Sequence, residues 1–221
     1  TGITCTGGSV EVINMVGWGV QGTLPTSLGL LTSLKRLNLY KNSFLGSLPT
    51  SIGLMESLVF LDLCSNLLTG TLPSTIGLMS SLSYLSLNSN SFQGSIPTSI
   101  GLLSSSSYLY LIHNSFTGTI PSSFGLLSSV KFVSMYDNLL TGKLPSSIAM
   151  MSSLSLLYLN RNSLTGSVPI NLCDLPSLHW INLEENLFSC YENCLTTVPA
   201  VELNNIPQCD SNSVFSHVNP N

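Results

Sequence analysis

Residues 82–97 read LSYLSLNSNSFQGSIP, and the same pattern recurs along the chain. Apolar residues stand five and three positions before Asn90 and two positions after it, a glycine follows four positions after it and a proline seven. A degenerate first copy carries Trp18 in place of the asparagine. The asparagine returns every 24 residues without a slip, at Asn42, Asn66, Asn90, Asn114, Asn138, Asn162 and Asn186. This fixed period predicts a repeat architecture of about eight stacked units.

Each unit combines one short strand with a second extended segment. The alternation of Leu85 and Leu87 has the period of a strand whose apolar side chains point inward. One strand per unit cannot bury its inner side alone, so we expect neighbouring units to pair their strands in parallel at about 4.8 Å. Residues 116–121 represent the second extended segment, and a short helical turn is expected on the outer side. The repeated asparagines then have a structural role, because their amides satisfy backbone groups of the turn.

The composition disfavours two classes of protein. The 221 residues carry a formal net charge of −4, and only 7% of them are charged. The six Lys and Arg residues are scattered, so no basic stripe is present to hold a nucleic acid. No run reaches the roughly 18 apolar residues of a membrane-spanning helix, so we expect no transmembrane segment in this chain. The chain begins at Thr1 without a leader, and we interpret it as a mature fragment or an excerpt of a longer protein, which could itself be membrane-anchored.

The repeating pattern LxxLxLxxNxLxGxLPxxIGxLxx resembles the plant-type leucine-rich repeat, as found in receptor-kinase ectodomains and secreted polygalacturonase inhibitors. The resemblance implies an α/β solenoid, a curved right-handed superhelix with a concave parallel β-sheet, a short second sheet and helical or 3-10 turns on the convex side. It also implies an extracellular, secreted or cell-surface location. In this family the concave face commonly binds proteins, peptides or glycans.

The resemblance also divides the chain into three parts. Residues 1–9 resemble the remnant of an N-terminal cap, in which Cys5 stands where the family carries a cap cysteine. Residues 10–190 form the solenoid of about eight units. Residues 191–221 are expected to form a disulfide-stapled C-terminal cap and a tail.

Four cysteines gather where the repeat decays, at Cys173, Cys190, Cys194 and Cys209. The end of a solenoid exposes apolar core, and two disulfides can staple a cover over it in an oxidising compartment. Four cysteines allow three pairings, of which we prefer Cys173 with Cys194 and Cys190 with Cys209. The competing interpretation is a zinc site. It is disfavoured because no second pair matches Cys190 and Cys194, and because His179 and His217 lack ligand spacing.

The titratable residues do not form a recognisable catalytic pattern. His113, His179 and His217 lie outside any nucleophile, metal or acid–base motif. Glu184 and Glu185 are adjacent, and adjacent residues of a strand point to opposite sides, which favours a solvated turn over a glycosidase pair. We therefore predict a protein that is not an enzyme, with no catalytic residue, no metal ligand and no cofactor.

The outward strand positions favour a recognition surface. Exposed aromatic residues at strand spacing form a patch, and Tyr, Trp and Arg dominate binding hot spots. The structural alternative is that neighbouring aromatic residues mainly stabilise the lateral stacking of the strands. Lys41, His113, Asp137 and Arg161 border the patch and are candidates for setting charge selectivity. The predicted site for a protein, peptide or glycan consists of Arg36, Tyr40, Phe60, Asp62, Tyr84, Tyr108, Tyr110, Phe132, Tyr136, Tyr158 and Trp180.

A second surface carries the alternative function, the binding of ice or another crystalline surface. Thr and Ser flank the glycine of most units and face outward by parity, which gives a regular, nearly uncharged array. Leu45 and Lys143 interrupt it, and Thr and Ser are the residues that the plant-type repeat usually carries there. The residues of this alternative surface are Thr69, Thr71, Thr117, Thr119, Thr141 and Thr165.

Overall fold

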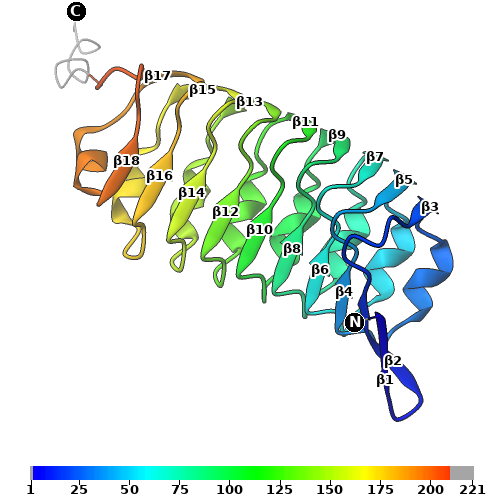
Figure 1. The fold of residues 1–221 in the computed structure, drawn as a ribbon. Helices are drawn as coiled ribbons and strands as arrows, with labels where there is room; N and C mark the ends of the chain where they lie inside the picture. The colour runs from blue at the N-terminus through cyan, green and yellow to red at the C-terminus, as the bar shows by residue number, and fades with distance from the viewer. Residues whose placement is uncertain (1, 210–221) are drawn as a thin grey trace, which may run out of the picture.

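The computed structural model describes residues 2–209 and forms a solenoid in which each unit stacks on the previous one (Figure 1). A ten-stranded sheet runs along one side. Its strands are β1 (Gly2–Thr6), β2 (Ser9–Asn14), β4 (Arg36–Asn38), β6 (Phe60–Asp62), β8 (Tyr84–Ser86), β10 (Tyr108–Tyr110), β12 (Phe132–Ser134), β14 (Leu156–Tyr158), β16 (Trp180–Asn182) and β18 (Ala200–Glu202). The predicted parallel solenoid is confirmed.

The ten-stranded sheet keeps the period of the sequence. Tyr108 of β10 pairs with Tyr84 on one side and Phe132 on the other, so residues one period apart lie side by side. The sheet has an antiparallel edge, because β1 folds back on β2 as a hairpin. At the opposite edge β18 pairs in parallel with β16, so the segment after residue 190 contributes one more strand.

A second sheet of eight short strands lies behind the first. Its strands are β3 (Gln21–Thr23), β5 (Ser43–Ser47), β7 (Leu67–Gly70), β9 (Ser91–Ser95), β11 (Ser115–Gly118), β13 (Leu139–Lys143), β15 (Ser163–Ser167) and β17 (Leu187–Cys190). Its register differs from that of the first sheet. Thr117 pairs with Ser95 on one side and with Leu139 on the other, so paired residues are 22 positions apart in the sequence, two fewer than the 24-residue period.

The predicted outer turns are 3-10 helices. They are η1 (Thr26–Leu30), η2 (Thr50–Leu54), η3 (Ser74–Leu78), η4 (Thr98–Leu102), η5 (Ser122–Leu126), η6 (Ser146–Met150), η7 (Ile170–Asp174) and η8 (Asn193–Thr197). Seven of them follow a proline in an extended conformation, as Pro73 precedes η3. The proline fixes its own φ and its carbonyl accepts the first bond of the turn, as from the Ile76 amide at 3.0 Å.

The outer turns stack closely because they carry a glycine. A methyl group on Gly101 would lie 2.2 Å from the carbonyl oxygen of Ser123 in the next unit, and Gly29, Gly53, Gly77 and Gly125 have equivalent neighbours. No side chain fits at that distance. The sixth unit has Ala149 at this position instead.

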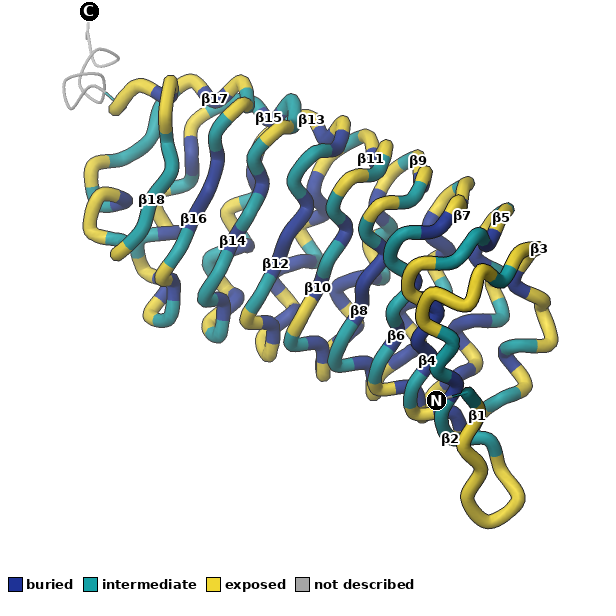
Figure 2. The backbone as a smooth tube through the Cα atoms, in the orientation of Figure 1, coloured by how far each residue is buried: buried dark blue, intermediate teal, exposed yellow. Residues whose placement is uncertain are grey.

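One continuous apolar core lies between the two sheets and the outer turns (Figure 2). Leu85 and Leu87 point into it as the alternation predicts, and both are fully buried. Phe92 and Phe116 stack inside the core with parallel rings 6.1 Å apart between centroids. The core therefore continues from each unit to the next without a break.

Each asparagine of the repeat closes the turn of its own unit and bonds to the previous one. The Asn138 amide nitrogen donates to the carbonyls of Leu111 at 2.9 Å and Met135 at 3.1 Å. Its side-chain oxygen accepts the Phe116 amide at 3.1 Å. The residue before each asparagine adopts a left-handed conformation with φ between 51° and 57°, at Lys41, Ser65, Ser89, His113, Asp137, Arg161 and Glu185.

Two disulfides close the C-terminal end, Cys173–Cys194 and Cys190–Cys209. The preferred pairing is thus formed, and the zinc interpretation is wrong because all four thiols are oxidised. His217 lies outside the described residues. Cys5 and Cys64 remain as thiols. Within residues 2–209, no helix has the length and apolar character needed to cross a membrane.

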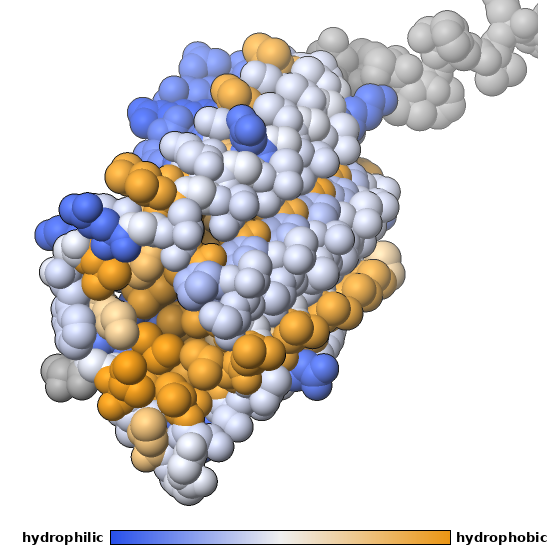
Figure 3. Space-filling view, turned by 90° about the vertical axis from the view of Figure 1, so that its right-hand side faces the viewer, coloured by the Kyte–Doolittle hydropathy of each residue, from blue (hydrophilic) through white to orange (hydrophobic). Residues whose placement is uncertain are grey.

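An apolar row runs along the molecule (Figure 3). The last residue of each of the first six outer turns is apolar although 50–76% of it is exposed. These residues are Leu30, Leu54, Leu78, Leu102, Leu126 and Met150. The seventh turn ends on Asp174 instead, so the row stops there.

Candidate functional site: the concave face

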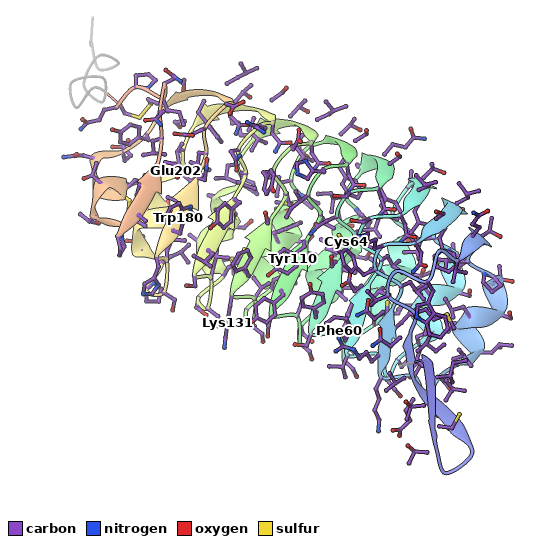
Figure 4. The ribbon with its side chains drawn as sticks, in the orientation of Figure 1. Phe60, Cys64, Tyr110, Lys131, Trp180 and Glu202 are labelled. Atoms are coloured by element: carbon purple, nitrogen blue, oxygen red, sulfur yellow. A yellow bond between two sulfur atoms is a disulfide. The ribbon has the colours of Figure 1, made fainter. Side chains whose placement is uncertain are left out.

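The solvent side of the ten-stranded sheet carries a continuous row of aromatic rings (Figure 4). We call this row the aromatic ladder: Phe60, Tyr84, Tyr108, Tyr110, Phe132, Tyr158 and Trp180. Phe60 and Tyr84 stack at 4.3 Å, Tyr110 and Phe132 lie 5.2 Å apart, and Tyr158 and Trp180 lie 6.2 Å apart between centroids. These separations are those of favourable aromatic pairs. The ladder spans every strand from β6 to β16.

The rings of the ladder are less exposed than the sequence predicts. Only Tyr108 counts as exposed, at 40%, whereas the other six rings are half-buried. The small polar residues between them are buried, with Ser86 at 2% and Ser134 at 1%. Large rings on adjacent strands cover each other and the serines beneath them, so outward strand positions are not all exposed. What remains accessible is a corrugated surface of ring faces and edges.

The other predicted site residues lie around the ladder. The Arg36 guanidinium sits 3.6 Å above the Phe60 ring, in a cation–π contact. The Asp62 carboxylate accepts the Cys64 amide at 3.0 Å, and burial raises the pKa of Asp62 above its usual value. Tyr40 lies on the turn after β4 and is exposed.

Tyr136 lies on the turn after β12 and belongs to the rim of the ladder. The His113 ring meets the Tyr136 ring edge-on at 5.0 Å, and His113 pairs with Asp137. The structure thus brings His113, Asp137 and Tyr136 together. The side chains of Glu184 and Glu185 do not act as a pair, since Glu185 pairs with Arg161 at 3.1 Å and Glu184 lies two residues after β16.

One residue of the site, Glu202, was missed by the sequence. Glu202 extends the concave face on β18, where its carboxylate accepts the side-chain amide of Asn182. No signal could have found Glu202, because the segment after Asn186 has lost the repeat. Within the described residues, no group of three or more His, Cys, Asp or Glu side chains converges to hold a metal ion. The site offers aromatic stacking, phenolic hydrogen bonds and fixed charges.

Comparison with known proteins identifies the family. The family model described as Leucine Rich Repeat matches residues 33–55, 57–79, 81–103, 107–127 and 153–175, about half of the chain. The chain belongs to the leucine-rich-repeat family. No curated protein sequence matches it significantly.

Solved leucine-rich-repeat structures share the fold. The ectodomain of the Arabidopsis thaliana membrane receptor kinase GASSHO1/SCHENGEN3, in complex with CASPARIAN STRIP INTEGRITY FACTOR 2, is 28% identical with a TM-score of 0.85, over 90% of this chain and 27% of that one. The PEPR1–AtPEP1 structure is 36% identical with a TM-score of 0.84, over 85% and 26%. A plant ice-binding protein is 21% identical with a TM-score of 0.61, over 96% and 88%. The chain spans about a quarter of the length of the two receptor structures.

The second face of this leucine-rich-repeat chain differs from the predicted array. Thr69, Thr117 and Thr141 are exposed, as parity predicts, and so are Thr71 and Thr119. Thr165 is half-buried. The shifted register places leucines beside threonines, since Thr117 pairs with Leu139 and Thr165 with Leu187. The face therefore mixes hydroxyl groups with exposed apolar side chains.

Tyr84 has the most perturbed phenol on the concave face. Burial raises the pKa of Tyr84 to about 12 from 10, and the nearby Asp62 carboxylate adds to the effect. Because the folded pKa exceeds the unfolded one, the neutral phenol favours folding below pH 10, and this contribution is lost as the pH rises from about 10 to about 12.

We expect an ultraviolet titration of the folded chain to show one tyrosine ionising near pH 12. The Tyr84→Phe variant should lose that step and keep the others. Between about pH 10 and about pH 12 the free energy of unfolding of this variant should fall less than that of the wild type. A high-pH step that survives in Tyr84→Phe contradicts the assignment.

Proposed function

We propose that this leucine-rich-repeat chain is a non-catalytic, extracellular recognition module. Its concave face binds a peptide, protein or glycan, either as part of a receptor ectodomain or as a secreted inhibitor. The aromatic ladder carries the proposal, because seven ring-bearing residues form one continuous surface and hold each other in place. Rings fixed in this way lose little side-chain entropy when a ligand binds.

Two further observations support the proposal. The similar solved structures include receptor ectodomains in complex with a ligand, and they share the backbone that presents the ladder. The two C-terminal disulfides favour an oxidising compartment, such as the cell exterior.

The test is a parallel screen of the wild type and a Tyr108→Ser, Tyr110→Ser, Tyr136→Ser variant against extracellular peptides and cell-wall glycans. We expect a ligand that the wild type retains and the variant loses by at least a hundredfold in affinity, because stacking surface and phenolic donors disappear together. Matching circular dichroism spectra would show that the variant is folded.

A matched control carries three exposed substitutions on the other sheet, Leu67→Ser, Leu139→Ser and Leu187→Ser. This control should bind like the wild type. A ligand held equally by all three proteins would place recognition elsewhere and overturn the proposal.

A second candidate function is adsorption to ice or another crystalline surface. The exposed threonines on β7, β11 and β13 favour it, because they stand on a regular parallel sheet. The leucines that the register inserts between them weaken it. Uptake into slowly growing ice by the wild type and the Tyr variant, lost in a Thr69→Lys, Thr117→Lys, Thr141→Lys variant, would favour this function over the first.

A further inference from the structure

The apolar row on the outer turns is exposed at positions where the fold does not require apolar residues. Its members, from Leu30 to Met150, stand at a position that the repeating pattern leaves open, directly before an inward-facing apolar residue. Asp174 occupies the same position in η7, so the turn tolerates a charged residue there. The six exposed apolar side chains are therefore a feature of the surface of this chain and are not needed for its core.

The row forms one continuous patch. Neighbouring outer turns stack closely, as the approach of Gly101 to Ser123 shows, so the members of successive units lie side by side (Figure 3). Between half and three-quarters of each member is exposed, which amounts to on the order of 100 Å² apiece and about 600 Å² for the row. An apolar patch of that size is at the upper end of what a soluble monomer leaves uncovered.

The surroundings of the row are nearly free of charge. The residues two and three positions after each row member are serine or threonine, with Glu56 as the one exception. Stable protein interfaces are likewise depleted of charged residues at their centre. Helices that lie on a lipid surface instead carry Lys, Arg and Trp around their apolar side, and the turns η1 to η6 hold none of these. The composition therefore favours a protein partner over a membrane.

The length of the row fits a second copy of the same row. The row begins on η1 and ends on η6, and a row of six members covers itself completely when one copy is turned end for end. A two-fold axis between Leu78 and Leu102 then brings Leu30 of one copy to Met150 of the other. Together with the flanking serines, each copy offers about the 800 Å² that one partner of a standard interface buries.

The antiparallel arrangement also matches the charges beside the row, because it sets η2 of one copy against η5 of the other. Glu56 lies two positions after η2, and Lys131 lies five positions after η5, on the loop that leads to β12. Both residues are exposed, and neither belongs to an ion pair within residues 2–209. The row lies in the lower part of Figure 3, and Lys131 lies at the lower edge in Figure 4, which shares its vertical axis.

The two-fold axis therefore places Glu56 of each copy near Lys131 of the other and creates two identical pairs of opposite charge. A parallel arrangement would set η2 against η2 and give neither residue a partner. Complementary charges at the edge of an apolar contact fix its orientation.

We propose that the apolar row is the interface of a homodimer, in which two copies of this chain pack their rows antiparallel about a two-fold axis between η3 and η4. The row lies on the outer turns, and the aromatic ladder lies on the solvent side of the ten-stranded sheet. The dimer therefore leaves both ladders uncovered, and a ligand with two binding sites is held by two ladders at once.

The first test is sedimentation velocity of the wild type over a series of concentrations. One chain has a mass of 23.6 kDa, and we expect a species of twice that mass at micromolar concentrations, since interfaces of this size bind with micromolar or tighter affinity. The Leu78→Ser, Leu102→Ser variant should raise the dissociation constant at least a hundredfold, because it removes four apolar side chains from the centre of the dimer.

A matched control carries Leu67→Ser with Leu139→Ser on the second sheet. These leucines are 54% and 55% exposed, as against 54% for both Leu78 and Leu102, so the two variants lose similar apolar surface from the monomer. The control should dimerise like the wild type. Thermal unfolding of dilute samples shows that both variants are folded.

The second test uses the charges and depends on the antiparallel arrangement. Glu56→Lys alone and Lys131→Glu alone each place like charges together twice, so each variant should dimerise about tenfold more weakly than the wild type. An equimolar mixture of the two variants should regain the affinity of the wild type, because each Lys of one chain then meets a Glu of the other. Added salt should reduce these differences.

Three results overturn the inference. A wild type that stays monomeric at every concentration, or a control that dissociates as readily as the Leu78/Leu102 variant, shows that the row is not the interface. A mixture of the two charge variants that associates no better than either alone shows that the rows are not antiparallel. A monomeric wild type that floats with phosphatidylcholine vesicles, when the Leu78/Leu102 variant does not, assigns the row to a lipid surface.

Discussion

Replacing Asn138 with alanine should lower the free energy of unfolding by about 3–5 kcal/mol. The side chain is only 6% exposed, and it satisfies the Phe116 amide and the carbonyls of Leu111 and Met135. Each buried backbone group left without a partner costs about 1–3 kcal/mol, and the methyl group of alanine replaces none of these bonds. Urea denaturation followed by circular dichroism measures the loss.

Two further variants test which hydrogen bonds of the asparagine, and how much its burial, account for the loss of stability. Asn138→Asp keeps an acceptor for Phe116 but turns a buried carboxylate oxygen toward the carbonyl oxygens of Leu111 and Met135, so at neutral pH it should destabilise at least as much as Asn138→Ala. Asn42 is the first of the repeated asparagines and is half-buried, so Asn42→Ala should lower the free energy of unfolding by less than Asn138→Ala does. A loss below about 1 kcal/mol for Asn138→Ala would show that water replaces the amide and would contradict the structural role.

Gly101→Ala should also destabilise the solenoid strongly, by about 3 kcal/mol. The new methyl group would lie 2.2 Å from the carbonyl oxygen of Ser123, which belongs to the backbone of the next unit and cannot rotate away. The two outer turns must therefore separate, and the core between them opens. Thermal unfolding of Gly101→Ala and the wild type measures the effect.

The chain offers its own control at the sixth unit. Ala149 already occupies the equivalent position there, so Ala149→Gly should change the free energy of unfolding by less than about 1 kcal/mol. If Gly101→Ala unfolds at the same temperature as the wild type, the outer turns are free to move apart and the close stacking does not limit stability.

The fold was predictable because it depends on spacing more than on individual residues. The 24-residue period fixed the register of the first sheet, as the pairing of Tyr108 with Phe132 shows. The prolines before seven of the eight outer turns and the C-terminal cysteines could also be recognised in the sequence. The recurring asparagine predicted a structural role, because its side-chain amide can both donate to and accept from backbone groups that are buried in a turn.

The site was predictable in outline only. Strand parity placed Tyr84, Tyr110 and Tyr158 on one face, but it could not show how far these rings would cover each other. The left-handed residues were not predictable, because Lys41, His113 and Asp137 are polar but none of them is a glycine or asparagine, the residues that usually mark this conformation. The shifted register of the second sheet was also hidden, since hydrogen bonding rather than periodicity decides which residues face each other.

The repeated asparagines link each unit only to its immediate neighbours, since Asn138 donates a hydrogen bond to Leu111 of the previous unit and to no unit before that. If one whole unit is deleted or duplicated, each asparagine at the new junction therefore meets an equivalent backbone carbonyl in the unit that now precedes it. The length of the concave face is adjustable in whole-unit steps of about 4.8 Å, each adding or removing one rung without redesign of the rest. The backbone therefore sets the spacing of the binding surface, and the outward side chains of each unit set its chemistry.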